Sequence, residues 1–179
     1  MNNLEQYDVV VIGAGPSGAL ASSLLVQKGW RVLVLEQQAF PRFSIGESLL
    51  PQCMAFLEEA GLIDILHDNA ATLGFQFKDG AAFHRAGQNT TINFTEKFTK
   101  GPGTTYQVKR ADFDKLLADK AQGQGVEIRY KHTVVDYCDE PNGASLVVHN
   151  EQQQAYSVNA RFVLDASGFG RVLPKLLDL

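Results

Sequence analysis

The sequence predicts an α/β fold in which a parallel sheet with helical crossovers is joined to an antiparallel β-meander. Residues 7–36 contain an apolar segment, a glycine-rich turn, a helical segment and a second apolar segment, the pattern of a βαβ unit. Two later apolar segments, at 126–130 and 162–164, are short enough to be buried parallel strands. Three alternating segments between them, separated by polar turns, predict the meander.

The glycine-rich turn at residues 13–18 (GAGPSG) follows the first strand and opens the first helix. Gly13 permits a tight turn, Gly15 lets a backbone approach a pyrophosphate, and Gly18 lets the helix pack closely on the strand. The free N–H groups at a helix N-terminus bind phosphate. Pro16, which itself has no N–H, and Ser17 open this helix and belong to the same candidate site.

Glu36 ends the second predicted strand, 23 positions after Gly13. An acid at about this spacing hydrogen-bonds a ribose hydroxyl in dinucleotide-binding proteins. Because the turn, the helix and the acid all occur in the expected context, the sequence favours a Rossmann-like dinucleotide site over a plain strand–turn–helix.

The middle of the chain predicts helices and short strands. A loop at 37–50, too apolar for a solvated linker, precedes a helix that starts near Pro51 and a shorter one at 63–68. The Asp-Gly pair in Lys78-Asp79-Gly80 predicts a hairpin between strands at 75–77 and 81–83. Strands at 90–94 and 106–109 flank a flexible loop, and a helix covers 111–122.

The last third of the chain predicts the strand at 126–130, meander strands at 133–137, 145–149 and 156–158, the strand at 162–164 and a helix at 172–177. We expect Cys53 and Cys138 to be small buried side chains, since they form no CxxC pair. No histidine or cysteine spacing indicates a metal site.

Composition excludes several classes of protein. A net charge of −4 gives no reason to expect a nucleic-acid partner. No apolar run has the length of a membrane span, so we expect no stable membrane insertion. The N-terminus lacks the basic region of a signal peptide, and we expect a cytoplasmic protein.

Three segments together resemble the FAD-binding half of the para-hydroxybenzoate-hydroxylase-like flavoproteins: the turn at 13–18, Arg110 before a helix, and residues 163–168 (VLDASG). Residues 40–51 (FPRFSIGESLLP) are similar to the flavin-dependent halogenase branch, and geranylgeranyl-reductase-like enzymes share much of this stretch. The resemblance implies FAD as cofactor. The residues it places at the cofactor are Gly13, Gly15, Pro16, Ser17, Gly18, Glu36, Arg42, Gly46, Glu47, Ser48, Arg110, Asp165 and Gly168.

Two of these residues also have ordinary explanations. Arg110 can simply pair with Asp112 or Asp114 on its own helix. Asp165 can be a turn residue, a common role for aspartate.

Lys78 is the catalytic candidate that the resemblance supplies. In the halogenase branch a lysine after the Gly-Glu-Ser segment relays hypohalous acid from flavin to substrate, and residues 75–83 are similar to its surroundings. An ammonium can polarise hypohalous acid, or an amine can carry the halogen. The alternative is that Lys78 is an exposed residue at a hairpin tip.

The resemblance implies an FAD-dependent oxidoreductase of the halogenase or monooxygenase type, acting on an aromatic or carrier-bound small molecule and served by a separate flavin reductase. Residues 72–108 would contribute to a substrate-facing β-region, with 1–179 as the FAD-binding domain. Because later family segments are not found, we expect a truncated protein. A double-bond reductase and a non-catalytic FAD-binding fragment remain the alternatives.

Overall fold

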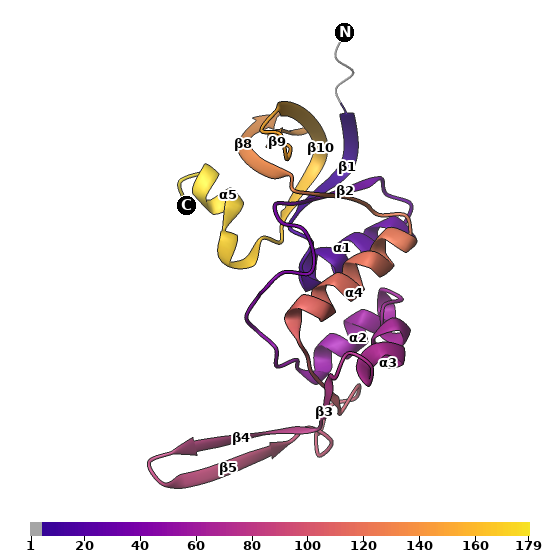
Figure 1. Cartoon of the computed structure of the whole chain (residues 1–179), viewed down its shortest axis with the longest axis vertical. Coiled ribbons are helices and arrows are strands. Elements are labelled where there is room, and N and C mark those ends of the chain that lie inside the picture. The colour runs from indigo at the N-terminus through magenta and orange to yellow at the C-terminus, as the bar shows by residue number, and fades with distance from the viewer. Residues whose placement is uncertain (1–4) are drawn as a thin grey trace.

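The computed structural model describes residues 5–179 (Figure 1). In chain order its elements are β1 (Glu5–Ile12), α1 (Pro16–Gln27), β2 (Val32–Glu36), α2 (Pro51–Glu59), α3 (Ile63–Ala70), β3 (Gln76–Lys78), β4 (Gly80–Arg85), β5 (Gln88–Asn93), β6 (Thr105–Gln107), α4 (Arg110–Gly123), β7 (Glu127–Tyr130), β8 (Thr133–Glu140), β9 (Gly143–His149), β10 (Ala155–Asp165) and α5 (Val172–Leu176).

The main sheet has six strands in the order β7-β2-β1-β10-β9-β8. The first four are parallel, and β9 and β8 continue antiparallel. The prediction that segments 8–12, 31–35, 126–130 and 162–164 share one parallel sheet is confirmed. Ile12 is in register with both Leu35 and Asp165, so β1, β2 and β10 end at the same edge.

The separation of segments 156–158 and 162–164 into two strands was wrong. Both belong to the single strand β10, whose first half pairs with β9 on one side while residues 158–165 pair with β1 on the other. The meander is therefore continuous with the parallel sheet and curls over it (Figure 1).

Both faces of the sheet are buried, which explains the unbroken apolar runs of β1 and β2. One face packs against α1 to α4 through residues such as Val11, Leu57 and Phe113. The other face packs against the folded-over meander and α5, with Leu33 and Leu146 fully buried. The C-terminal ends of the parallel strands lie between these two layers.

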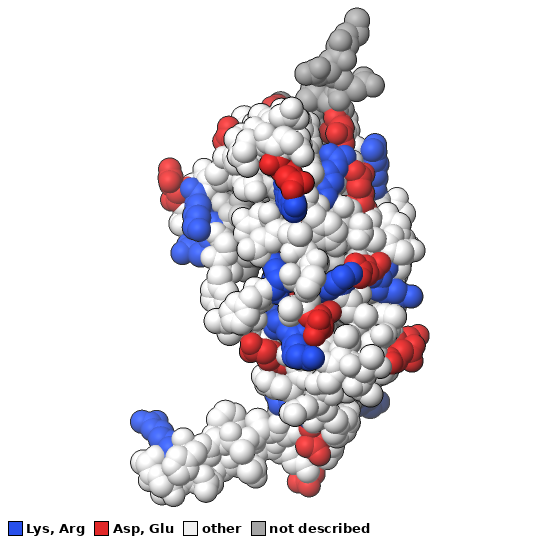
Figure 2. All heavy atoms as spheres, viewed as in Figure 1, with Lys and Arg blue, Asp and Glu red and all other residues white. Residues whose placement is uncertain are grey.

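The predicted hairpin at Lys78-Asp79-Gly80 was also wrong. β3 pairs with β6, far along the chain, while β4 pairs with β5 through a turn at Ala86-Gly87. The β4–β5 ribbon projects from the body of the molecule (Figure 1). Figure 2 shows it as an almost uncharged surface, Arg85 being its one charged residue.

The burial of individual side chains tests two smaller expectations. Cys53 is half-buried, but Cys138 is exposed on β8, so the expectation of a buried Cys138 was wrong. The loop before α2 folds inward only in part, since Phe40 packs on the core while Phe43 is 84% exposed. Among residues 5–179, no helix combines the length and apolar character needed to cross a membrane.

Candidate functional site

The three glycines of the turn after β1 differ in what surrounds them. Gly13 has a φ of +99°, and a Cβ there would lie 2.8 Å from the carbonyl oxygen of Ala166. A Cβ on Gly18 would lie 1.9 Å from the carbonyl oxygen of Gly13, so α1 packs against the turn through this position. Both glycines are required by the fold itself.

Gly15 is not required in this way. Its φ is −64°, which any residue adopts, and the protein atoms nearest to a methyl group added at this position would be Arg42 Nη2 at 3.5 Å and Asp114 Oδ2 at 3.9 Å. Since neither backbone geometry nor packing demands glycine, the side-chain-free space in front of Gly15 fits a molecule that approaches the backbone closely.

Helix α1 begins at this point with its N-terminus open. Gly15 is its N-cap residue, Pro16 follows, and no side chain caps the first turn. The first N–H groups of a helix have no intrahelical acceptor and carry the positive end of the helix dipole. This arrangement suits a phosphate group.

A cavity of about 300 Å³ lies in front of the turn, at the C-terminal ends of β1, β2 and β10. This is where ligands bind in open α/β sheets. Eight of the predicted cofactor residues line it: Gly13, Gly15, Pro16, Ser17, Glu36, Arg42, Arg110 and Gly168.

Glu36 is 3% exposed, and both of its carboxylate oxygens accept backbone hydrogen bonds. Oε2 accepts from the N–H of Ala14 and Oε1 from the N–H of Gln38, each at 2.9 Å. The side chain therefore fixes the glycine turn to the end of β2. A carboxylate has about four lone-pair sites, so it retains capacity to accept a ribose hydroxyl.

Two arginines on the cavity wall share one buried carboxylate. Asp114 on α4 is fully buried and accepts from Arg110 Nε at 2.7 Å and Nη2 at 2.9 Å, while Arg42 Nη1 lies 3.2 Å away. Arg110 Nη1 also donates to the carbonyl oxygen of Ile45 at 2.6 Å. The pairing of Arg110 with Asp114, which the sequence left as an alternative, thus coexists with a place on the cavity wall.

Five predicted cofactor residues do not line the cavity: Gly18, Gly46, Glu47, Ser48 and Asp165. Gly46 has a φ of +107° and lies over Arg110, whose Nη1 would be 3.0 Å from a Cβ. The carboxylate of Asp165 accepts from the backbone N–H groups of Ser167 and Leu173, each at 2.9 Å. Asp165 therefore makes the contacts of a turn residue, and its place at the cofactor stays a prediction.

Sequence reasoning missed several cavity residues, among them His132, Ala166 and Ser167. His132 follows β7 and the other two follow β10, so each comes directly after a parallel strand. Their position after these strands was a signal that could have found them, because parallel strands end at one edge. Asp114 was also missed as a site residue, although it lies four positions after Arg110 on a helix.

Lys78 lies at the end of β3, half-buried and outside the cavity lining. Its Nζ donates to Ser48 Oγ at 2.6 Å and to the carbonyl oxygen of Leu49 at 3.0 Å. Lys78 is thus tied to the Gly-Glu-Ser loop and does not lie at a hairpin tip.

Comparison with known proteins agrees with this geometry. A family model described as "FAD binding domain" matches residues 6–177. This chain belongs to that family. FAD is accordingly its cofactor, and the open Gly15, the uncapped α1 N-terminus and the two arginines provide a site that fits an anionic dinucleotide.

Two halogenases and a flavoprotein are among the matched relatives. The chain is 34% identical over 167 residues to the flavin-dependent halogenase armH1 of Armillaria mellea, covering 90% of this chain and 31% of the relative. It is 34% identical to the 1H-pyrrole-2-carbonyl-[peptidyl-carrier protein] brominase of Pseudoalteromonas luteoviolacea, covering 94% and 39%. A crystal structure of a flavoprotein/dehydrogenase from Cytophaga hutchinsonii superposes with a TM-score of 0.91 at 43% identity, covering 98% and 42%. The chain therefore spans less than half the length of these proteins.

Proposed function

We propose that this halogenase-like FAD-binding chain functions as an FAD-dependent oxidoreductase that halogenates an aromatic or carrier-bound small molecule. The observation that carries the proposal is the anchoring of Lys78 against the Gly-Glu-Ser loop, through Ser48 and Leu49. A solvent-exposed hairpin lysine would have no such fixed contacts. The halogenase names of two relatives support the same choice.

In this proposal the cavity residues bind the cofactor, and Lys78 binds or reacts with hypohalous acid. Gly15 and the α1 N-terminus would bind the pyrophosphate, Glu36 the adenosine ribose, and Arg42 and Arg110 would balance negative charge. When bound and reduced, FAD would supply the two electrons that reduce O2 to the peroxide level, and this oxidant would convert halide to hypohalous acid and water. The Lys78 ammonium would polarise hypohalous acid by hydrogen bonding, or the neutral amine would take the halogen and release water.

We assign residues 72–108 to the substrate-facing β-region. The β4–β5 ribbon projects from the sheet and exposes Phe83 and Ile92, each more than half accessible. An apolar ribbon of this kind suits packing against further polypeptide or an apolar substrate. In this proposal a separate flavin reductase supplies the reduced FAD.

A flavin-dependent reductase is the second candidate function. The observation in its favour is the similarity to the Cytophaga hutchinsonii flavoprotein/dehydrogenase. In that case FAD delivers hydride to a double bond and Lys78 is incidental. A third outcome is a non-catalytic FAD-binding fragment.

Halide dependence separates these functions. The FAD-loaded chain, supplied with NADH, a flavin reductase, O2 and bromide, is incubated with an electron-rich phenol or pyrrole, and products are identified by mass spectrometry. The proposal expects brominated product that disappears without bromide and in Lys78→Ala, but persists in the control Lys120→Ala. Reduction of an alkene without halide would support the reductase, and FAD binding without any turnover would support the fragment.

A further inference from the structure

The backbone brings Lys78 and Ser48 to opposite sides of one short strand. Lys78 is in register with Thr105 of β6, and Ser48 forms an antiparallel bridge with Gln107 of the same strand. A backbone hydrogen bond from the N–H of Val108 to the carbonyl oxygen of Glu47, at 2.8 Å, secures the loop beside β6. The side chain of Lys78 therefore crosses β6 to reach the loop.

Two acceptors on the loop hold the amine of Lys78. They are Ser48 Oγ at 2.6 Å and the carbonyl oxygen of Leu49 at 3.0 Å, and the ring centroid of Phe94 lies 5.3 Å from Nζ. An ammonium has three N–H donors, of which these contacts use two. Within residues 5–179, the third has no protein acceptor.

The loop that supplies these acceptors also forms part of the cavity wall. Arg42, Ser44 and Ile45 line the cavity, whereas Ser48 does not. The resemblance places Ser48 near the cofactor, and in the structure its hydroxyl accepts a hydrogen bond from Lys78. One end of the loop thus lines the cavity, and the other end binds the amine of Lys78.

We propose that Ser48 is a positioning residue for Lys78: its hydroxyl, with the Leu49 carbonyl, fixes the amine so that one N–H donor is left for a ligand. The catalytic meaning of this contact rests on the proposed halogenase function, while the contact itself does not. Hypohalous acid is the ligand class that the free donor would receive, because its oxygen accepts a hydrogen bond.

Competitive amine labelling of the purified chain tests the contact. Trace acetic anhydride modifies each lysine according to the accessibility and nucleophilicity of its neutral amine. Peptide mass spectrometry then gives the labelling of Lys78 relative to Lys120. We expect Ser48→Ala to raise relative labelling of Lys78 about threefold, the order expected for one net hydrogen bond lost. Ser48→Thr keeps a hydroxyl on an exposed loop position and should restore the original value. Ser157→Ala, an exposed serine on β10, is the matched control.

Unchanged labelling of Lys78 in Ser48→Ala would overturn the proposal. A loss of FAD affinity of about threefold in the same variant would also overturn it, because it would show that Ser48 contacts the cofactor. In the bromination assay, Ser48→Ala should lower product per NADH consumed about threefold, with Ser48→Thr restoring it. If Ser48→Ala shows the labelling response while the wild-type chain brominates nothing, the halogenase function fails and the Ser48–Lys78 contact stands.

Discussion

At the residue scale, the glycines of the turn after β1 are of two kinds: two that the fold requires, and one that only a bound ligand would require. Gly13 and Gly18 face backbone atoms that leave no room for a methyl group. Gly15 meets only side-chain atoms at ordinary contact distance, with an unstrained backbone. A substitution at Gly18 would therefore disturb the fold before it could report on a ligand, and Gly15 is the cleaner probe of the site.

We predict that Gly15→Ala folds normally but binds FAD at least about tenfold more weakly, the equivalent of one lost charge-assisted hydrogen bond. The added methyl group would occupy the space that a pyrophosphate needs. Flavin fluorescence titration measures the dissociation constant, and circular dichroism checks the fold. Gly123→Ala, at a position with open space on α4, is the matched control. Equal FAD affinity in Gly15→Ala and wild type would show that the pyrophosphate does not bind at this turn.

We predict that Lys78→Arg binds FAD like the wild type but forms no halogenated product. A guanidinium is a planar fork that stays protonated, so it cannot act as an amine, and its donors point differently from those of an ammonium. Product analysis with bromide and a reductase partner measures the effect, with Lys120→Arg as control. A halogenating Lys78→Arg variant would exclude a role for the lysine as a halogen-carrying amine.

At the element scale, helix α4 and the loop before α2 are joined through one carboxylate. Asp114 is fully buried on α4, and its two arginine partners come from α4 itself and from the loop. Arg110 also reaches the carbonyl oxygen of Ile45 in that loop. The cavity wall therefore depends on Asp114, although Asp114 itself does not line the cavity.

We predict that Asp114→Asn lowers the free energy of unfolding by about 3 kcal/mol, because it leaves two largely buried guanidinium groups without their counter-charge. Urea denaturation measures this value. The control is Asp119→Asn on the same helix, where an exposed ion pair with Lys115 contributes within about 0.5 kcal/mol. Similar losses in the two variants would mean that Asp114 does not hold the wall together.

Some of these elements and their pairings could be predicted from the sequence, and others could not. The βαβ unit and the parallel strands were predictable because each depends on local pattern and on a fixed crossover geometry. The pairing of β3 with β6 was not, since it joins segments separated by the whole β4–β5 ribbon. A local Asp-Gly signal at 79–80 suggested a turn there, but strand pairing placed the turn at Ala86-Gly87. The contact of Lys78 with Ser48 follows from that long-range pairing and was hidden for the same reason.

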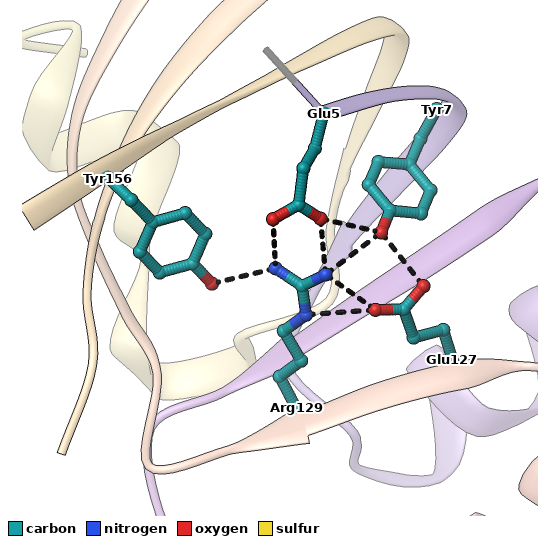
Figure 3. Close-up of polar contacts among 5 residues, drawn as sticks. All are labelled: Glu5, Tyr7, Glu127, Arg129 and Tyr156. Carbon is teal, nitrogen blue, oxygen red and sulfur yellow. Dashed lines mark hydrogen bonds and ion pairs between the residues drawn. The ribbon is translucent and has the colours of Figure 1, made fainter. Parts of the chain in front are cut away.

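At the scale of the whole molecule, a polar cluster joins three strands of the main sheet (Figure 3). Arg129 on β7 donates to both carboxylate oxygens of Glu5 on β1, to Glu127 Oε1 at 2.6 Å and to Tyr156 Oη on β10 at 3.2 Å. Tyr7 donates to Glu127 Oε2 at 2.8 Å, and burial followed by this bond raises the pKa of Tyr7 well above its ordinary range. The cluster links residues from the beginning, middle and end of the chain.

We predict a pH-dependent contribution to stability from Glu5. The hydrogen bond from Arg129 lowers the pKa of Glu5 below its ordinary value of 4.5, so its contribution is complete above pH 4.5 and is lost as the pH falls through the lowered folded value. Glu5→Gln should therefore destabilise the chain at neutral pH, with the difference from wild type shrinking in acid. Thermal unfolding between pH 7 and pH 3 measures it, with exposed Glu59→Gln as control. If the stability difference between Glu5→Gln and wild type stays constant from pH 7 to pH 3, the ionised Glu5 carboxylate does not contribute to stability.

The candidate site is a property of the whole fold, which limits how much of it the sequence could predict. The turn at 13–18, Glu36 and Arg110 were predictable because they fall in or beside recognisable patterns. Their assembly with Arg42, His132 and Ser167 into one cavity depends on five segments meeting at one sheet edge. Motif membership also placed Asp165 and Ser48 at the cofactor, which stays a prediction. Their contacts with Ser167 and Lys78 could not be predicted from the motif, because they depend on the fold.

Titration of the purified chain with FAD, followed by quenching of flavin fluorescence, tests the central claim that the cavity at the α1 N-terminus is an FAD site. We expect saturable binding of one FAD per chain that excess NAD does not displace. Absence of saturable binding, or equal competition by NAD, would contradict the assignment of this cavity to FAD.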